Sequence, residues 1–166
     1  MLDTVTRYLE GVTETKWRWA LRRIVSPVAD RLSSQPLTAA GLVINGGGAL
    51  YPKIGATPFF AVATGVLVTL AAGTALPPPT GINTAAGGFN VACYFVNSAG
   101  TVSVLGGTPA PTVGGVKWPQ FPTGSALIGF LVIGGPGAFL GGTTPLDTAT
   151  TVYVSPMGAF DPTVLV

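Results

Sequence analysis

Few residues of this chain are suited to catalysis. It contains no histidine, which excludes Ser-His-Asp and Cys-His nucleophile pairs and removes the commonest metal ligand. Asp147 and Asp161 are the only carboxylates after residue 30, and two carboxylates about 5 to 9 Å apart can hydrolyse a glycosidic bond. Each lies beside turn residues, so we interpret both as side chains that cap turns.

The single cysteine, Cys93, lies in an alternation of apolar residues. A reactive thiol needs an accessible, electropositive setting, so this context predicts a small buried hydrophobic residue rather than a nucleophile. The chain also lacks the Gly-x-Ser-x-Gly, P-loop and Cys-x-x-Cys spacings. The sequence therefore predicts a protein that is not an enzyme and that uses no cofactor and no metal.

Four aromatic residues within residues 37–166 could take part in binding. They are Tyr51, Trp118, Phe121 and Tyr153. Such residues can line a sugar-binding groove, but in β-sandwiches they are more often core residues or interface anchors. We favour the core or interface interpretation.

Charge is distributed very unevenly along the 166 residues. Residues 32–166 carry only Lys53, Lys117, Asp147 and Asp161. A body with so little charge tends to associate, because near-zero net charge and apolar surface favour contact between molecules. We therefore expect much of its surface to be covered in an obligate assembly.

The first 33 residues differ from the rest and are predicted to form one or two short amphipathic helices. Leu2, Val5, Leu9 and Val12 recur at helical spacing, and so do Trp17, Leu21, Ile24, Val28 and Leu32. Gly11 and Pro27 are expected to break or bend the pattern.

A basic cluster in this helical region is interleaved with two tryptophans. The cations are Lys16, Arg18, Arg22 and Arg23, and the aromatics are Trp17 and Trp19. The cluster fits a solvated helix face, a docking site for an acidic protein partner, or a contact with nucleic acid or a membrane surface. Four cations are too few for typical nucleic-acid binding. We favour docking on a protein, with anchor contacts at Trp17, Trp19, Arg22 and Arg23, and expect no membrane insertion.

Residues 37–166 are predicted to be mainly β, and one strand is expected at the centre. Ala126–Ile133 is apolar at consecutive positions, which is typical of a strand covered on both faces, and Gly134–Gly137 ends it. Phe59–Ala63 and Val66–Leu70 are predicted to pair as a hairpin.

The stretch Phe89–Val96 is predicted to be a strand with two different faces. Val91, Cys93 and Phe95 point to one side, and the alternate residues Ala92, Tyr94 and Val96 to the other. Asn97–Gly100 is the predicted turn of a hairpin with Thr101–Leu105. Thr151–Val154 is the last predicted strand.

About seven to eight short strands of this kind predict a β-sandwich or jelly-roll-like barrel. The expected organisation is an amphipathic anchoring arm and linker over residues 1–36, followed by a β domain for oligomerisation over residues 37–166.

Three blocks of the β domain resemble structural proteins of tailed-bacteriophage virions. They are YFVNSAGTVSVLGG (Tyr94–Gly107), FPTGSALIGFLVI (Phe121–Ile133) and FLGGTTPLDTATTVYV (Phe139–Val154). The Gly-Gly-Thr-Thr-Pro-Leu-Asp stretch is the most specific part. The resemblance implies a capsid decoration (cement) protein or a head-fibre protein, commonly a homotrimer.

The sequence and the resemblance together predict a virion structural protein. We expect a homo-oligomer, a trimer, that decorates a phage capsid and bridges neighbouring subunits of the major capsid protein. It would be made in the host cytoplasm and reside on the capsid surface. The alternative is a trimeric fibre, spike or adhesin module that binds a host surface glycan through loops after Gly106 and around Gly134–Gly137.

Overall fold

The computed structural model of the chain describes residues 32–158, which form eleven strands and two short 3-10 helices. The strands are β1 (Gln35–Pro36), β2 (Val43–Ile44), β3 (Pro52–Lys53), β4 (Phe59–Ala63), β5 (Val66–Leu70), β6 (Asn83–Thr84), β7 (Phe89–Asn97), β8 (Val102–Gly106), β9 (Ser125–Gly134), β10 (Phe139–Leu140) and β11 (Thr150–Val154). The 3-10 helices are η1 (Val113–Gly115) and η2 (Leu146–Thr148).

The prediction of a mainly β fold is confirmed. The predicted strand number was too low, because five of the eleven strands have only two residues each. The predicted helical arm lies outside the described residues, apart from its last few positions.

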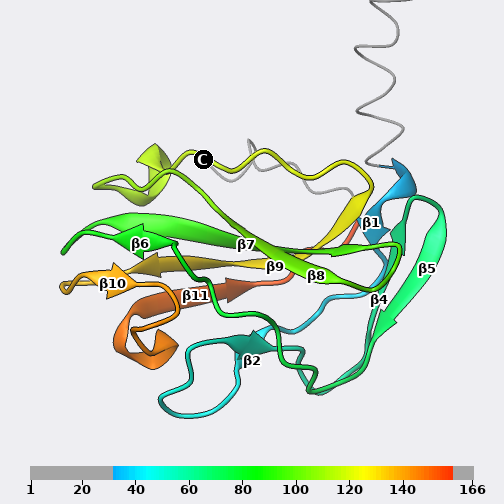
Figure 1. The fold of residues 1–166 in the computed structure, drawn as a ribbon, viewed down its shortest axis with the longest axis horizontal. Helices are drawn as coiled ribbons and strands as arrows, with labels where there is room; N and C mark the ends of the chain where they lie inside the picture. Colours follow the sequence, from blue (N-terminus) through cyan, green and yellow to red (C-terminus); the bar gives the residue numbers. More distant parts are fainter. Residues whose placement is uncertain (1–31, 159–166) are drawn as a thin grey trace, which may run out of the picture.

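The largest sheet has four antiparallel strands in the order β11-β9-β7-β8, which run side by side across the molecule (Figure 1). β9 lies between β7 and β11, so that Val132 pairs with Val91 on one side and Val152 on the other. Residues 126–131 are all buried. The predicted central strand is therefore confirmed, and its continuous apolar run reflects cover on both faces.

The two faces of β7 belong to two separate apolar clusters, as the alternation predicted. Ala92, Tyr94 and Val96 join the larger cluster, and Val91, Cys93 and Phe95 join the smaller one. The larger cluster contains side chains from the short sheets and from β4 and β5, including Phe59, Ile54, Leu76, Phe139 and Leu146. The smaller cluster is packed instead against the 107–122 loop. We call these the inner and outer faces of the four-stranded sheet.

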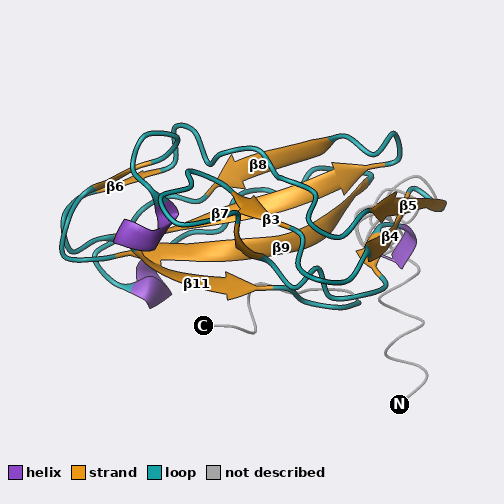
Figure 2. Ribbon diagram, turned by 90° about the horizontal axis from the view of Figure 1, so that it is seen from below, coloured by secondary structure: helices purple, strands orange, loops and turns teal. Residues whose placement is uncertain are grey.

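The β4–β5 hairpin lies at one end of the four-stranded sheet (Figure 2). Its turn residues Thr64 and Gly65 have φ angles of 50° and 78°, and two consecutive positive φ angles are typical of the tight turns that connect hairpin strands. The predicted pair of strands is confirmed. Gln35–Pro36, which were predicted to be linker, form β1 and pair with β4. A two-residue strand ending at proline has no alternation by which it could be recognised in a sequence.

A second predicted hairpin, β7–β8, is closed by an asparagine side chain. The Asn97 Oδ1 accepts hydrogen bonds from the N–H groups of Ala99 and Thr101, both at 3.0 Å. Gly100 adopts a φ of 77°, which favours glycine. These interactions fix the register of β8 on β7 and confirm the predicted turn at Asn97–Gly100.

Candidate interaction surfaces

The predicted anchor residues Trp17, Trp19, Arg22 and Arg23 lie outside the described residues, and so does Asp161. Asp147 is described and has a structural contact. Its Oδ2 accepts a hydrogen bond from the N–H of Gly48 at 2.7 Å, which joins η2 to a loop 99 residues earlier in the chain. This contact agrees with the interpretation of Asp147 as a turn-capping side chain, although the turn is the one at Gly48; in the turn next to Asp147, the Thr148 hydroxyl donates to the Pro145 carbonyl, also at 2.7 Å.

Cys93 is completely buried in the outer-face cluster, as predicted. Burial raises the pKa of its thiol far above the ordinary value of 9.0, because a thiolate there would lose its hydration. Its neighbour Tyr94 is buried on the inner face, and burial, with smaller contributions from Tyr153 and Cys93, raises the pKa of its phenol. Both groups are therefore held neutral, which suits packing and not nucleophilic chemistry.

The Tyr94 hydroxyl is buried without a hydrogen-bond partner among the described residues. We expect Tyr94→Phe to raise the free energy of unfolding by about 1 kcal/mol at neutral pH, because an unsatisfied buried hydroxyl is destabilising.

The same burial predicts a loss of stability at alkaline pH. In the unfolded chain Cys93 and Tyr94 ionise above about pH 9 and 10, whereas the native protein keeps them protonated. The unfolded state then binds fewer protons, so the contribution of these two groups to the free energy of unfolding is constant below about pH 9 and falls above it. Urea unfolding at a series of pH values measures this. Tyr94→Phe should reduce the part of the decline that begins near pH 10, and Tyr153, whose pKa is also raised by burial, should account for what remains. An identical decline in both proteins would refute the assignment to Tyr94.

The four aromatic residues singled out in the sequence do not form one groove. Trp118 and Phe121 pack on the outer face, where Trp118 contacts Phe130 edge-to-face with ring centroids 4.8 Å apart. Phe121 makes a similar contact with Phe95 at 5.0 Å. Tyr153 packs against the inner-face cluster instead. Their placement agrees with the core interpretation for Trp118, Phe121 and Tyr153.

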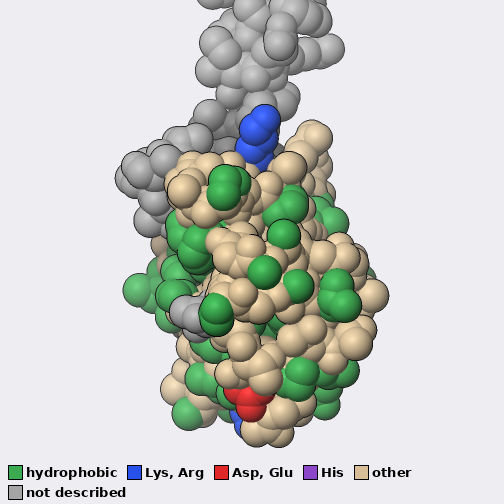
Figure 3. All heavy atoms as spheres, turned by 90° about the vertical axis from the view of Figure 1, so that its left-hand side faces the viewer, with side chains coloured by type: hydrophobic (Ala, Val, Ile, Leu, Met, Phe, Trp, Pro, Cys, Tyr) green, Lys and Arg blue, Asp and Glu red, His purple; other side chains and the backbone are tan. Residues whose placement is uncertain are grey.

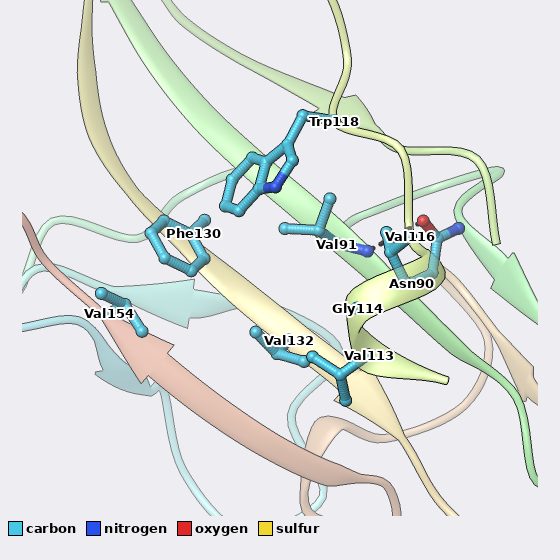
Figure 4. A pocket seen from close by; sticks show the side chains of 9 residues that line it. All are labelled: Asn90, Val91, Val113, Gly114, Val116, Trp118, Phe130, Val132 and Val154. Atoms are coloured by element: carbon cyan, nitrogen blue, oxygen red, sulfur yellow. Dashed lines mark hydrogen bonds between the residues drawn. The ribbon is translucent and has the colours of Figure 1, made fainter. Parts of the chain in front are cut away.

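A groove of about 440 Å³ lies on the outer face, between the sheet and the loop that carries η1. Figure 4 shows Trp118 and Phe130 at one end and Val113 and Val132 at the other. Its lining residues come from β7, β9, β11 and the loop: Asn90, Val91, Val113, Gly114, Val116, Trp118, Phe130, Val132 and Val154. This groove has the size and apolar lining of a binding site. The sequence does not reveal this groove, because nothing in it shows where the 107–122 loop crosses the sheet.

The β4–β5 hairpin presents a second apolar surface. Phe60 and Leu67 alternate with buried residues of their strands and are 36% and 62% exposed. Val66, the first residue of β5, is also exposed, and so are Leu37, which follows β1, and Leu32 at the start of the described chain. We call these five residues the hairpin patch. Half of the ten large hydrophobic side chains exposed within residues 32–158 belong to it, which marks a contact surface.

Charged side chains contribute little to the surface of the described residues, which contain only Lys53, Lys117 and Asp147. Figure 3 shows one face of the body, on which blue and red side chains appear only near its two ends and hydrophobic side chains are scattered between them. The described residues contain no group of three or more His, Cys, Asp or Glu side chains placed to hold a metal ion. They also contain no helix that is both long and apolar enough to cross a bilayer.

Comparisons of the chain with protein-family models, with curated proteins and with solved structures find no match.

Proposed function

We propose that this chain is a non-enzymatic structural protein of a phage virion, which decorates the capsid as a homo-oligomer and bridges neighbouring capsid subunits. The observation that carries the proposal is the hairpin patch on a body with three charges in residues 32–158. Exposed apolar side chains concentrated at the β4–β5 hairpin favour contact with another surface, because covering them removes apolar area from water. The resemblance of the three sequence blocks to virion proteins is the reason for proposing a virion as the assembly that covers this surface.

The position of the hairpin patch suits a bridging role. Leu32 is the first described residue, and it leads directly into β1, which pairs with β4. The basic, tryptophan-containing segment with Trp17, Trp19, Arg22 and Arg23 therefore enters the body at the patch. In this proposal sister copies meet at the hairpin patches, as a trimer, and the segments before Leu32 dock on the major capsid protein. Many weak contacts of this kind together stabilise a shell.

The assembly step is tested by placing a charge on the patch. We expect Leu67→Glu to weaken self-association by about tenfold or more, because burying the Leu67 side chain contributes about 1 to 2 kcal/mol and a buried carboxylate adds a further penalty. Sedimentation equilibrium over a range of concentrations measures the change. Val43→Glu is the matched control, since Val43 is an exposed strand residue on β2, away from the hairpin patch. Equal association of both variants would exclude the patch as the contact.

Incorporation of the chain into a virion is tested with purified phage particles. Phage particles banded in a density gradient, from a culture that makes this chain, should contain it in stoichiometric amounts. Deleting residues 1–31 should remove it from the particles and leave its self-association intact. A chain that remains monomeric at high concentration and is absent from banded particles would refute the proposal.

A further inference from the structure

The loop between β2 and β3 contains the only Asn-Gly pair in the chain, Asn45-Gly46. The other three asparagines are followed by threonine, valine or serine. Asparagine is thermolabile, because the backbone nitrogen of the next residue can attack its side-chain amide. A glycine at that next position has no Cβ to obstruct the attack and leaves the backbone free to rotate. The residue types at Asn45-Gly46 therefore favour this reaction.

The structure leaves both reacting groups of Asn45-Gly46 free. The Asn45 side chain is half-buried and Gly46 is exposed. Neither the Asn45 side-chain amide nor the Gly46 N–H is hydrogen-bonded to another described residue. A Cβ built at Gly46 meets no atom within 4 Å, so there is open space for a ring to form between the two residues. Figure 1 shows this loop projecting from the body next to β2, where water reaches it.

Hydrogen bonds hold the side chains of the other three asparagines. Asn97 Oδ1 accepts from two backbone N–H groups of its turn. Asn90 is 2% exposed, and both its Oδ1 and its Nδ2 are engaged. Asn83 Oδ1 accepts from the Gly141 N–H at 3.1 Å. These amides would have to give up their contacts before they could react, so the fold protects them and not Asn45.

The Asn45 loop is also the segment that holds η2. Asp147 Oδ2 accepts from the Gly48 N–H at 2.7 Å, and the Leu146 N–H donates to the Ala49 carbonyl at 3.0 Å. Gly48 follows Asn45 by three residues, so their Cα atoms are at most about 11 Å apart. A chemical change at position 45 therefore takes place close to a contact between distant segments of the chain.

We propose that Asn45-Gly46 is a site of spontaneous deamidation and backbone isomerisation in the folded protein, with water as the only co-reactant. The Gly46 nitrogen attacks the Asn45 Cγ. The new C–N bond forms as the Cγ–Nδ2 bond breaks, and ammonia leaves with the proton of the Gly46 N–H. Water then opens the resulting succinimide ring at either carbonyl, which yields aspartate or isoaspartate at position 45. The proposal does not depend on the virion role.

The products should loosen the attachment of the loop to η2. An isoaspartyl linkage adds a methylene group to the backbone after position 45, which displaces the turn that presents the Gly48 N–H. Both products also place a negative charge in the loop, and Asp147, the only carboxylate side chain within residues 32–158, is repelled by it. Lys53 pairs with Val43, two residues before Asn45, and offsets part of this repulsion.

Peptide mapping of the aged full-length protein tests the site. Trypsin cleaves after Arg31, Lys53 and Lys117, which places Asn45 alone in peptide 32–53 and the other three asparagines in peptide 54–117. After incubation of the native protein in warm, mildly alkaline buffer, peptide 32–53 should contain aspartate and isoaspartate at position 45. It should also accept a methyl group from protein isoaspartate methyltransferase. Peptide 54–117 should keep its amides.

The isolated peptides supply the reference rates. Native Asn45 should react within about tenfold of its rate in peptide 32–53, whereas native Asn97 should react at least about tenfold more slowly than in peptide 54–117, because its two hydrogen bonds must break first. A native Asn45 that keeps its amide while the free peptide loses it would overturn the proposal. Equal reaction of Asn45 and Asn97 in the native protein would also overturn it.

Asn45→Gln is the matched control, because attack on the longer side chain requires a six-membered ring and is much slower. This variant should form no isoaspartate in peptide 32–53. The Gly48 N–H should exchange with solvent deuterium faster in the aged wild-type protein than in the aged Asn45→Gln protein, and equally fast in the two fresh proteins. Equal exchange after ageing, in wild-type protein that has been converted, would refute the loosening of the contact with Asp147.

Discussion

Replacing Phe59 with alanine is expected to lower the free energy of unfolding by about 3 to 5 kcal/mol. Phe59 is completely buried on β4 and belongs to the inner-face cluster, where it is among the largest side chains. Alanine would leave a cavity between the β4–β5 hairpin and the four-stranded sheet, which close-packed neighbours cannot fill without strain. The hairpin would lose the largest of its side chains in that cluster.

The next residue provides a matched control. Phe60 has the same side chain on the same strand, but it points outward and is 36% exposed. Phe60→Ala should change the free energy of unfolding of the monomer by no more than about 0.5 kcal/mol, as most surface substitutions do, while weakening self-association through the hairpin patch.

Urea unfolding at a protein concentration low enough to keep both variants monomeric separates the two effects. Sedimentation of the same proteins at higher concentration then measures association. If Phe60→Ala destabilised the monomer as much as Phe59→Ala, the outward face of the hairpin would be part of the core and not a contact surface.

Alternation along single strands made the long strands predictable. The faces of β7 follow from the sequence because apolar residues occupy six consecutive positions, and both sides must then be covered. β4 and β5 were predictable because a two-residue turn with glycine separates two strand-forming runs. β1, β2, β3, β6 and β10 were not, since two residues cannot show a period.

The interaction surfaces were less predictable than the strands. The composition of residues 32–166 shows that apolar surface must be covered, but it does not show which residues are exposed. Val152 and Val132 are both valines in apolar strands, and only the position of β11 at the sheet edge leaves Val152 exposed. The same applies to Asp147, whose contact with Gly48 joins distant segments. Such contacts depend on tertiary arrangement and have no local signal.

The glycines between β9 and η2 differ sharply in the space available to an added Cβ atom. Gly141→Ala is expected to be severely destabilising. A Cβ atom at Gly141 would collide with the carbonyl oxygen of Pro79 and would lie 2.7 Å from that of Ile82. Both obstacles are backbone atoms of the segment that leads into β6, so neither can rotate away. We expect the free energy of unfolding to fall by about 3 kcal/mol, the upper end of the usual range for overpacking.

Gly137→Ala is the matched control for Gly141→Ala. Gly137 is exposed, has no atom within 4 Å of an added Cβ, and does not have a positive φ. Both substitutions remove the same conformational freedom from the unfolded chain, so the difference between them isolates the collision at Gly141. Gly137→Ala should change stability by less than about 0.5 kcal/mol. Similar unfolding midpoints for the two variants would mean that β10 does not lie against the segment around Pro79. The pairing of β10 with β6 would then have to be revised, because the close approach of Gly141 to Pro79 and Ile82 positions these two strands together.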